Sequence, residues 1–381
     1  MIPYGRQSIT QRDIDSVVEV LRSDFLTQGP QVPNFEKDVS SYCKAKYAVA
    51  VNSATSALHL ACLSLGLKKG DWLWTSPITF AASANCGLYC GAFIDFVDID
   101  SNTYNMCPEA LEKKLAKAEV AGKLPKVVVP VHLSGQSCDM KSIYKLSQRY
   151  GFKIIEDASH AIGGQYLDKP IGSCQYSDVA VFSFHPVKII TTGEGGMALT
   201  NDKRVFERMS LLRSHGITRD IGQMIEPVDE SWYYQQIELG YNYRITDIQA
   251  ALGISQFKKI NQIVSRRHEI AERYNKLLSD LPLKLPRQSN EGYSAFHLYV
   301  VRLKNKSHRK QVFKSLRDKG IGVNLHYIPV YRHPYYQSMG FDISAFPESE
   351  SYYQEAITIP LYHAMSIQDQ DTVVQSIKES L

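Results

Sequence analysis

The sequence predicts an α/β protein in which a large domain with a mostly parallel sheet precedes a smaller α+β domain. Short apolar segments alternate with helical segments up to about residue 245, an order typical of right-handed βαβ units. One apolar segment, residues 127–131, has no polar side chain, which indicates a strand covered on both faces. The 381-residue length fits two domains, at roughly 150 residues for each.

The predicted elements of the large domain follow one another closely. Thr10 is a capping residue and begins a helix that continues through Leu21. Further helices are expected at residues 35–42, 53–65, 81–89, 108–118 and 141–150. Strands are expected at residues 47–51, 72–75, 92–97, 127–131, 153–157, 178–184 and 196–200.

The pattern changes after residue 245. Thr246 caps a long helical run that reaches Leu277, long enough at about 1.5 Å per residue to cross a domain. Beyond it we expect strands at residues 297–303, 322–327 and 357–361, and helices at residues 307–319 and 366–381. The predicted domains are therefore residues 1–245 and 282–381, joined by a connecting helix at residues 246–281.

Composition excludes several classes of protein. With 44% apolar and 10% aromatic residues the chain can build a large core, so disorder is not expected. The 43 basic and 39 acidic residues nearly balance at a net charge of +4, which gives no reason to expect a nucleic-acid or membrane partner.

The sequence gives no indication of a targeting segment or of a metal site. The N-terminus lacks the apolar region of a secretory signal, and no segment approaches the ~18 consecutive apolar residues of a membrane span. Seven cysteines without a CxxC pair indicate reduced thiols in a cytoplasmic protein, and we expect no metal site.

Three groups of residues are candidates for chemistry. Residues 53–56 (Ser-Ala-Thr-Ser) begin a helix directly after a strand, where unpaired N–H groups can bind a phosphate, although taken alone they fit a plain helix cap better, because such caps are common. Asp157 follows an apolar strand at the edge of the sheet where ligands bind, with His160 three residues on. A helix cap and a structural histidine are the alternatives for these two residues.

Lys188 is the third candidate. It follows the strand at residues 178–184 and precedes a glycine-rich turn, and an amine buried there would become a nucleophile for carbonyl groups. An exposed loop lysine is the alternative. In combination, a phosphate cup, a strand-end Asp and a strand-end Lys meet the needs of pyridoxal 5′-phosphate (PLP), with Phe80 placed to stack on the ring.

On these residues the chain resembles the sugar aminotransferases of the DegT/DnrJ/EryC1/StrS family, which have the aspartate aminotransferase fold (PLP fold type I). The resemblance runs from about Tyr4 to the C-terminus. Besides the segments above it rests on Pro77-Ile-Thr-Phe80, Thr192-Gly-Glu-Gly-Gly196, Arg213-Ser-His-Gly216, residues 240–250 and His326-Tyr-Ile-Pro-Val330.

The resemblance implies roles for individual residues. Lys188 would be the catalytic residue that forms the Schiff base with PLP, and Asp157 would pair with the pyridine nitrogen. His160 would lie near the ring hydroxyl, Phe80 over the ring, and Ala54, Thr55 and Ser183 at the phosphate. Asn242 would reach the cofactor of the partner subunit, which implies a homodimer with a shared site. The substrate contacts implied are Tyr4, Asp24, Phe25, Leu26, Thr27, Ala54, Ser183, His185, Asn242, Asn324, Leu325, His326 and Tyr327.

Within the family, the likeness is greatest to the C4 aminotransferases of pseudaminic acid biosynthesis. These enzymes use L-glutamate, release 2-oxoglutarate, and aminate UDP-2-acetamido-2,6-dideoxy-β-L-arabino-hex-4-ulose through pyridoxamine phosphate. Amination at C4 or C3 of another UDP- or dTDP-linked sugar stays open, as does a non-catalytic binding or regulatory protein on the same fold. Family members that dehydrate sugars have His in place of the lysine, and Lys188 speaks against that activity.

Overall fold

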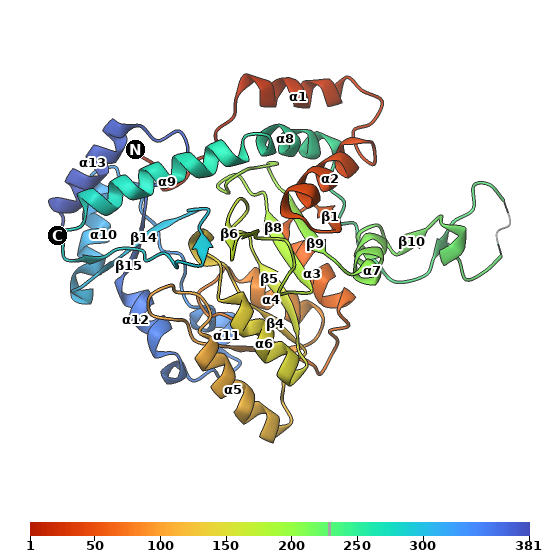
Figure 1. Ribbon diagram of the computed structural model, residues 1–381, viewed down its shortest axis with the longest axis horizontal. Coiled ribbons are helices and arrows are strands. Elements are labelled where there is room, and N and C mark those ends of the chain that lie inside the picture. The colour runs from red at the N-terminus through yellow and green to blue at the C-terminus, as the bar shows by residue number, and fades with distance from the viewer. Residues whose placement is uncertain (228–229) are drawn as a thin grey trace.

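The computed structural model describes residues 1–227 and 230–381. A central sheet is covered by helices, a smaller C-terminal region lies beside it, and an arm projects on the opposite side (Figure 1). The arm carries the short strands β10 (Ile217–Thr218) and β11 (Gln235–Gln236). Both chain termini lie with the C-terminal region (Figure 1).

The central sheet has seven strands in the order β1-β9-β8-β5-β4-β2-β3. All neighbours are parallel except β9, which runs antiparallel to both β1 and β8. The mostly parallel sheet that the sequence predicts is therefore confirmed. The strands are β1 (Tyr47–Val51), β2 (Trp72–Thr75), β3 (Phe93–Phe96), β4 (Val127–Val129), β5 (Lys153–Asp157), β8 (Val179–Ser183) and β9 (Gly196–Thr200).

The antiparallel strand has a simple cause. A parallel neighbour needs a crossover connection, usually through a helix, whereas the segment between β8 and β9 forms turns and no helix. The chain therefore comes straight back beside β8. Because this return is short, Lys188 and the turn that precedes Gly196 stay at the end of β8.

Helices cover both faces of the sheet. In chain order they are α1 (Gln11–Leu21), α2 (Gln31–Cys43), α3 (Ala54–Ser64), α4 (Ala82–Tyr89), α5 (Pro108–Ala121), α6 (Met140–Tyr150) and α7 (Lys203–Arg213). A separate three-stranded sheet, not expected from the sequence, joins β6 (Gln165–Tyr166), β7 (Lys169–Pro170) and β13 (Gly292–Tyr293).

The long helical run predicted from Thr246 is two helices, so the prediction of one helix was wrong. α8 (Asp247–Phe257) ends before α9 (Ile260–Leu277) begins. Lys259 stands at the break, and its ammonium group lies 2.8 Å from Oδ2 of buried Asp13 in α1. The break lets α8 stay packed on α1 and α2 while α9 continues to the C-terminal region (Figure 1).

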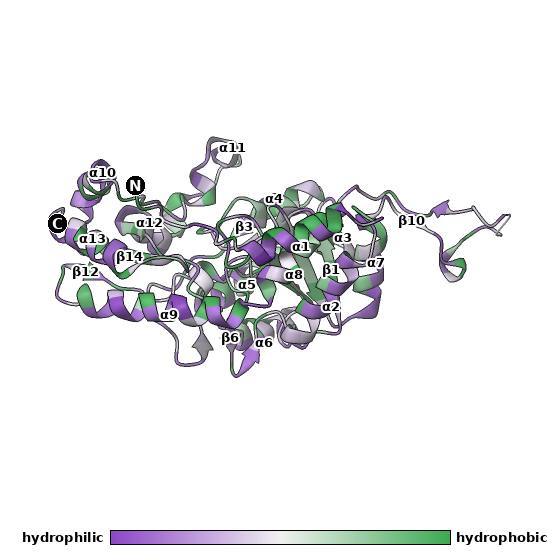
Figure 2. Ribbon diagram, turned by 90° about the horizontal axis from the view of Figure 1, so that it is seen from above, coloured by the Kyte–Doolittle hydropathy of each residue, from purple (hydrophilic) through white to green (hydrophobic). Residues whose placement is uncertain are grey.

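The C-terminal region has its own core. β12 (Leu283–Lys284), β14 (Tyr299–Leu303) and β15 (Ala356–Ile359) form an antiparallel sheet, and α9, α10 (Arg309–Asp318) and α13 (Ile367–Lys378) pack against it. Two short helices, α11 (Pro334–Gln337) and α12 (Pro347–Glu355), connect these elements. In Figure 2, α9 alternates between purple and green turns, as a helix does when one side faces a core.

The strand predicted at residues 322–327 does not form. The segment makes two isolated bridges instead: Asn324 pairs with Thr358 of β15, and Ile2 pairs beside Ile321, where its N–H donates to Gly320 O at 2.9 Å and its carbonyl accepts from Gly322 N–H at 2.7 Å. The segment after Asn324 is left as a loop. The predicted domains, residues 1–245 and 282–381 with a connection at 246–281, stay a proposal, because N-terminal residues pair with the C-terminal region.

No helix within the described ranges combines the length and the apolar character that crossing a membrane requires.

The contact that fixes the α8–α9 break gives a testable prediction. Burial alone would raise the pKa of Asp13, but hydrogen bonds from Lys259, Ser255 and Thr10 outweigh it and lower the pKa to about 2. Asp13 therefore stabilises the fold above its unfolded pKa near 3.8, and this contribution is lost as the pH falls from there toward 2. We expect Asp13→Asn to cost about 2 kcal/mol at neutral pH.

Urea unfolding of both proteins at neutral and at acidic pH measures this difference. The control is Asp15→Asn, because Asp15 is exposed and bonds only to Gln11 within its own helix. Equal losses in the two variants, or a loss for Asp13→Asn that does not shrink in acid, would contradict the interpretation.

Candidate active site

A cavity of about 670 Å³ opens where the ends of β5 and β8 meet the beginnings of α3 and α4. Parallel strands bring their carboxyl ends to one edge, where α/β proteins bind ligands. The loop after Asn324 closes the cavity from the C-terminal region. The predicted site residues that line it are Tyr4, Ala54, Thr55, Phe80, Asp157, His160, Ser183, His185, Lys188, His326 and Tyr327.

Seven other predicted residues do not line this cavity. Asp24, Phe25, Leu26 and Thr27 are exposed after α1, in a segment tied to the start of α8 because Asp247 N–H donates to Leu26 O at 3.0 Å. Asn242 is exposed and pairs with Ser214, which directly follows α7. Asn324 and Leu325 stand behind the cavity wall, where Asn324 N–H donates to Thr358 O at 3.1 Å.

The beginning of α3 forms the phosphate cup that the sequence predicts. Ser53 caps the helix by accepting from Ser56 N–H at 3.1 Å, and the first N–H groups of a helix have no acceptor within it. Gly196 of β9 lies directly against this turn: a Cβ atom there would be 2.4 Å from Ala54 N. The absence of a side chain at Gly196 thus keeps the cup open, at the positive end of the helix dipole.

Asp157 and Lys188 are the charged pair of the cavity. Asp157 is 5% exposed; its Oδ2 accepts from Ser83 Oγ at 2.6 Å and its Oδ1 from Ser159 N–H at 3.1 Å. Burial lowers the pKa of Lys188 to about 8, and the Asp157 charge offsets part of that effect. An amine with this pKa is partly neutral at physiological pH and so is a competent nucleophile.

The histidines around Lys188 are kept neutral. Burial, followed by the positive charge of Lys188, lowers the pKa of His160 well below its usual value and that of His326 to about 4. Ser134 N–H donates to Nδ1 of His160 at 3.3 Å, so its ring proton sits on Nε2 and is donated to the Tyr327 hydroxyl at 3.1 Å. These two hydrogen bonds therefore fix the tautomer of His160, with its proton on Nε2.

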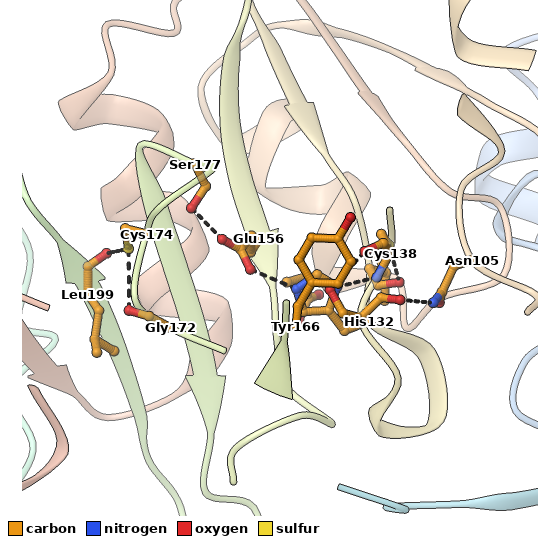
Figure 3. A network of polar contacts seen from close by, with 12 residues as sticks. Asn105, His132, Cys138, Glu156, Tyr166, Gly172, Cys174, Ser177 and Leu199 are labelled. Atoms are coloured by element: carbon orange, nitrogen blue, oxygen red, sulfur yellow. Dashed lines mark hydrogen bonds and ion pairs between the residues drawn. The ribbon is translucent and has the colours of Figure 1, made fainter. Parts of the chain in front are cut away.

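A second buried network stands behind Asp157 (Figure 3). Successive residues of a strand face opposite sides, so Glu156 lies on the reverse side of β5 from Asp157. Its carboxylate accepts from Nε2 of His132 at 2.7 Å and also bonds to Ser177. The backbone N–H of His132 also donates to the backbone carbonyl of Asp157 at 3.0 Å, and this hydrogen bond secures the end of β5.

Several cavity residues were missed by the sequence analysis. Thr79 lines the cavity just before α4, and Ser83, four residues on within α4, stands behind the cavity and donates to Asp157; this spacing was the available signal. His297 lies within a predicted strand, so its position gave no signal. Its ring centre is 4.4 Å from that of His160, and its buried Nδ1 has no hydrogen-bond partner in the described part of the chain.

The donor set fits PLP. The open cup at α3 suits a phosphate, Asp157 suits a protonated ring nitrogen, Lys188 suits the aldehyde, and Phe80, 63% exposed, lines the same cavity. In residues 1–227 and 230–381, no group of three or more His, Cys, Asp or Glu side chains is placed to hold a metal ion.

Comparison with known proteins agrees with this arrangement. The model of the DegT/DnrJ/EryC1/StrS aminotransferase family matches residues 7–378. The spore coat polysaccharide biosynthesis protein SpsC of Bacillus subtilis is 38% identical over 99% of this chain and 96% of its own. The UDP-4-amino-4,6-dideoxy-N-acetyl-beta-L-altrosamine transaminase of Campylobacter jejuni is 38% identical over 97% of this chain and 94% of its own.

Solved structures agree as well. Helicobacter pylori PseC, an aminotransferase involved in the biosynthesis of pseudoaminic acid, superposes with a TM-score of 0.90 at 30% identity, covering 100% of this chain and 98% of that one. The putative sugar aminotransferase Spr1654 of Streptococcus pneumoniae in its PMP form gives 0.91 at 28% identity, covering 100% and 99%.

The chain therefore belongs to the DegT/DnrJ/EryC1/StrS aminotransferase family. The predictions of an aminotransferase, of PLP fold type I and of PLP as the cofactor are confirmed. The roles given to single residues stay predictions, although most of those residues line one cavity.

The lowered pKa of Lys188 gives a second testable prediction. Only the neutral amine attacks an aldehyde, so covalent attachment of PLP to the apo-enzyme should accelerate as the pH rises, with a midpoint near the Lys188 pKa of about 8. Attachment is measured by absorbance after PLP is mixed with the apo-enzyme across a pH series. Lys188→Arg is the control and should attach none. A midpoint near the ordinary lysine value of 10.5 would contradict the burial argument.

Proposed function

We propose that the protein transfers the amino group of L-glutamate to C4 of UDP-2-acetamido-2,6-dideoxy-β-L-arabino-hex-4-ulose, as in pseudaminic acid biosynthesis. The observation that carries an amino transfer is the buried pair in one cavity: an amine with a pKa of about 8 beside a carboxylate held by two donors. The choice of sugar is supported by the Campylobacter transaminases, which are 36% and 38% identical over 97% of this chain.

Each cavity residue has a task in this proposal. PLP, when bound, would supply an electron sink for the transfer of the amino group. Lys188, once its amine is free, moves a proton at the carbon that gains or loses nitrogen. Asp157 keeps a negative charge beside the ring nitrogen, where it stabilises positive charge in a site that excludes water. Ala54, Thr55 and Ser183 hold the phosphate, and Phe80 covers one side of the ring.

The sugar is proposed to enter over Tyr4, His185, His326 and Tyr327. The tyrosine hydroxyls of Tyr4 and Tyr327 stay protonated, because burial raises the pKa of both. They can therefore donate to sugar or diphosphate oxygens without adding charge. His326, whose pKa is lowered by burial, is neutral and serves the same purpose.

We infer that two copies of the chain build each site. The arm exposes large apolar side chains, including Trp232 at 68% and Leu239 at 79%, close in sequence to Asn242. Asn242 and the segment from Asp24 to Thr27 lie outside their own cavity, which suits contacts made in a partner's site. A homodimer would cover these apolar groups. The protein is proposed to work in the cytoplasm, in keeping with its seven free cysteines.

Amination of a different nucleotide sugar is the alternative, and a specific observation favours it. SpsC, from spore coat polysaccharide biosynthesis, has the same 38% identity over nearly the whole chain. A UDP- or dTDP-linked ketone at C4 or C3 would use the same cofactor residues. The discriminating contacts would then lie with Tyr4, His185 and the loop from Asn324 to Tyr327.

Product analysis tests the substrate. The enzyme, PLP and L-glutamate are incubated separately with the UDP-linked L-arabino 4-ketone and with UDP- and dTDP-linked 4-keto and 3-keto analogues, and the products are examined by NMR. We expect turnover of the L-arabino ketone to UDP-4-amino-4,6-dideoxy-N-acetyl-L-altrosamine, with a specificity constant at least about 100-fold above that of the others. Selective turnover of an analogue would replace the substrate assignment without touching the amino-transfer chemistry.

Subunit mixing tests the shared site. Lys188→Ala and Asn242→Asp subunits, each inactive alone, are co-expressed so that they form mixed dimers; the new aspartate repels the cofactor phosphate. If Asn242 serves the partner's cofactor, each mixed dimer contains one intact site, and activity returns to about a quarter of the wild-type value. If Asn242 served its own subunit's site, mixing would restore no activity.

A further inference from the structure

Two hydroxyl groups, that of Thr79 just before α4 and that of Ser83 in the first turn of α4, form a chain that ends on Asp157. Thr79 Oγ1 lies 2.7 Å from Ser83 Oγ, and Ser83 Oγ lies 2.6 Å from Asp157 Oδ2. Thr79 is 2% exposed and lines the cavity, whereas Ser83 is 0% exposed and stands behind it. The chain therefore connects the cavity wall with its buried carboxylate.

The direction of this chain follows from the count of protons. A carboxylate can only accept, so the single hydroxyl proton of Ser83 goes to Asp157; its other acceptor, Phe80 O, is farther away at 3.4 Å. Ser83 Oγ then accepts from Thr79, whose own proton is committed in turn. Both O–H dipoles consequently point toward the carboxylate.

The two donors to Asp157 also fix the orientation of its carboxylate. Ser83 holds Oδ2, while Ser159 N–H holds Oδ1 at 3.1 Å. With a donor on each oxygen, the carboxylate cannot rotate about its Cβ–Cγ bond without losing one of them. Hydrogen bonds to an ionised acceptor are about twice as strong as neutral ones, and a buried charge without donors is costly.

Starting from the role proposed above for Asp157, we propose that Ser83 is a positioning residue of the transamination reaction, with Thr79 as the outer member of its hydroxyl chain. Ser83 holds the Asp157 carboxylate in one orientation, so that the carboxylate meets the PLP ring nitrogen without reorganisation. Ser83 itself contacts neither cofactor nor substrate in this assignment. Its effect should appear wherever the strength of the contact between Asp157 and the ring is measured.

The test compares four proteins: wild type, Ser83→Ala, Ser83→Thr and Ser76→Ala. Ser76 is the matched control, because its hydroxyl is 1% exposed, lies just ahead of Thr79 in the sequence, and has no hydrogen-bond partner in the described ranges. Three quantities are measured for each: the PLP dissociation constant of the apo-enzyme, the pH midpoint of the bound-cofactor absorbance, and the rate of the half-reaction with L-glutamate. Thermal unfolding reports whether each variant is folded.

For Ser83→Ala we expect a roughly tenfold weaker PLP affinity, a roughly tenfold slower glutamate half-reaction and a shifted pH midpoint. Ser83→Thr keeps a hydroxyl group at this position. Its PLP affinity and half-reaction rate should lie within about threefold of the wild-type values, and its pH midpoint should equal that of wild type. Ser76→Ala should leave them within about twofold.

Two results would overturn the proposal. One is a Ser83→Ala protein that matches Ser76→Ala in PLP affinity and pH midpoint. The other is a folded Ser83→Thr protein as impaired as Ser83→Ala, because the shape of the side chain would then matter and not its proton. The glutamate half-reaction involves no sugar, so either result would leave the nucleotide-sugar proposal to its own test.

Discussion

The site depends on one constraint: a carboxylate and an amine are both kept out of water in the same cavity. Asp157 is 5% exposed, and a charge buried to that extent needs donors. It receives one from α4 through Ser83 and one from its own turn through Ser159. Lys188 has no comparable support, so burial lowers its pKa to about 8. The fold thus gives the carboxylate two hydrogen-bond donors, while burial makes the charged form of the amine less favourable.

The charge state of the other groups that line the cavity is set by the same burial. Burial lowers the pKa of His160, His297 and His326, and the positive charge of Lys188 lowers each of them further. No arginine is among the described residues that line the cavity. Anions must therefore be held by the beginning of α3, by hydroxyls and neutral rings, or by a second subunit. This explains how a nearly neutral chain can serve phosphorylated ligands without a basic surface.

Much of this could be read from the sequence, because strand ends and helix beginnings carry local signals. Asp157 and Lys188 each follow an apolar strand, and in a parallel sheet such positions converge. Ser83 and His297 carry no such signal: a serine early in a helix resembles a cap, and a histidine in an apolar strand resembles core. The α8–α9 break carries no local signal, and the contact made there, from Lys259 to Asp13, joins residues more than two hundred positions apart. Residues 24–27 and Asn242 do not line the cavity of their own chain, so the roles that the resemblance gives them stay predictions.

The most direct measurement of the central claim is borohydride reduction of the enzyme loaded with PLP, followed by peptide mass spectrometry. The account predicts a pyridoxyl group on Lys188 alone, and its loss when L-glutamate is added before the reductant. A label on any other lysine, or a label on Lys188 that glutamate does not remove, would contradict the assignment of the buried amine as the group that exchanges with the amino donor.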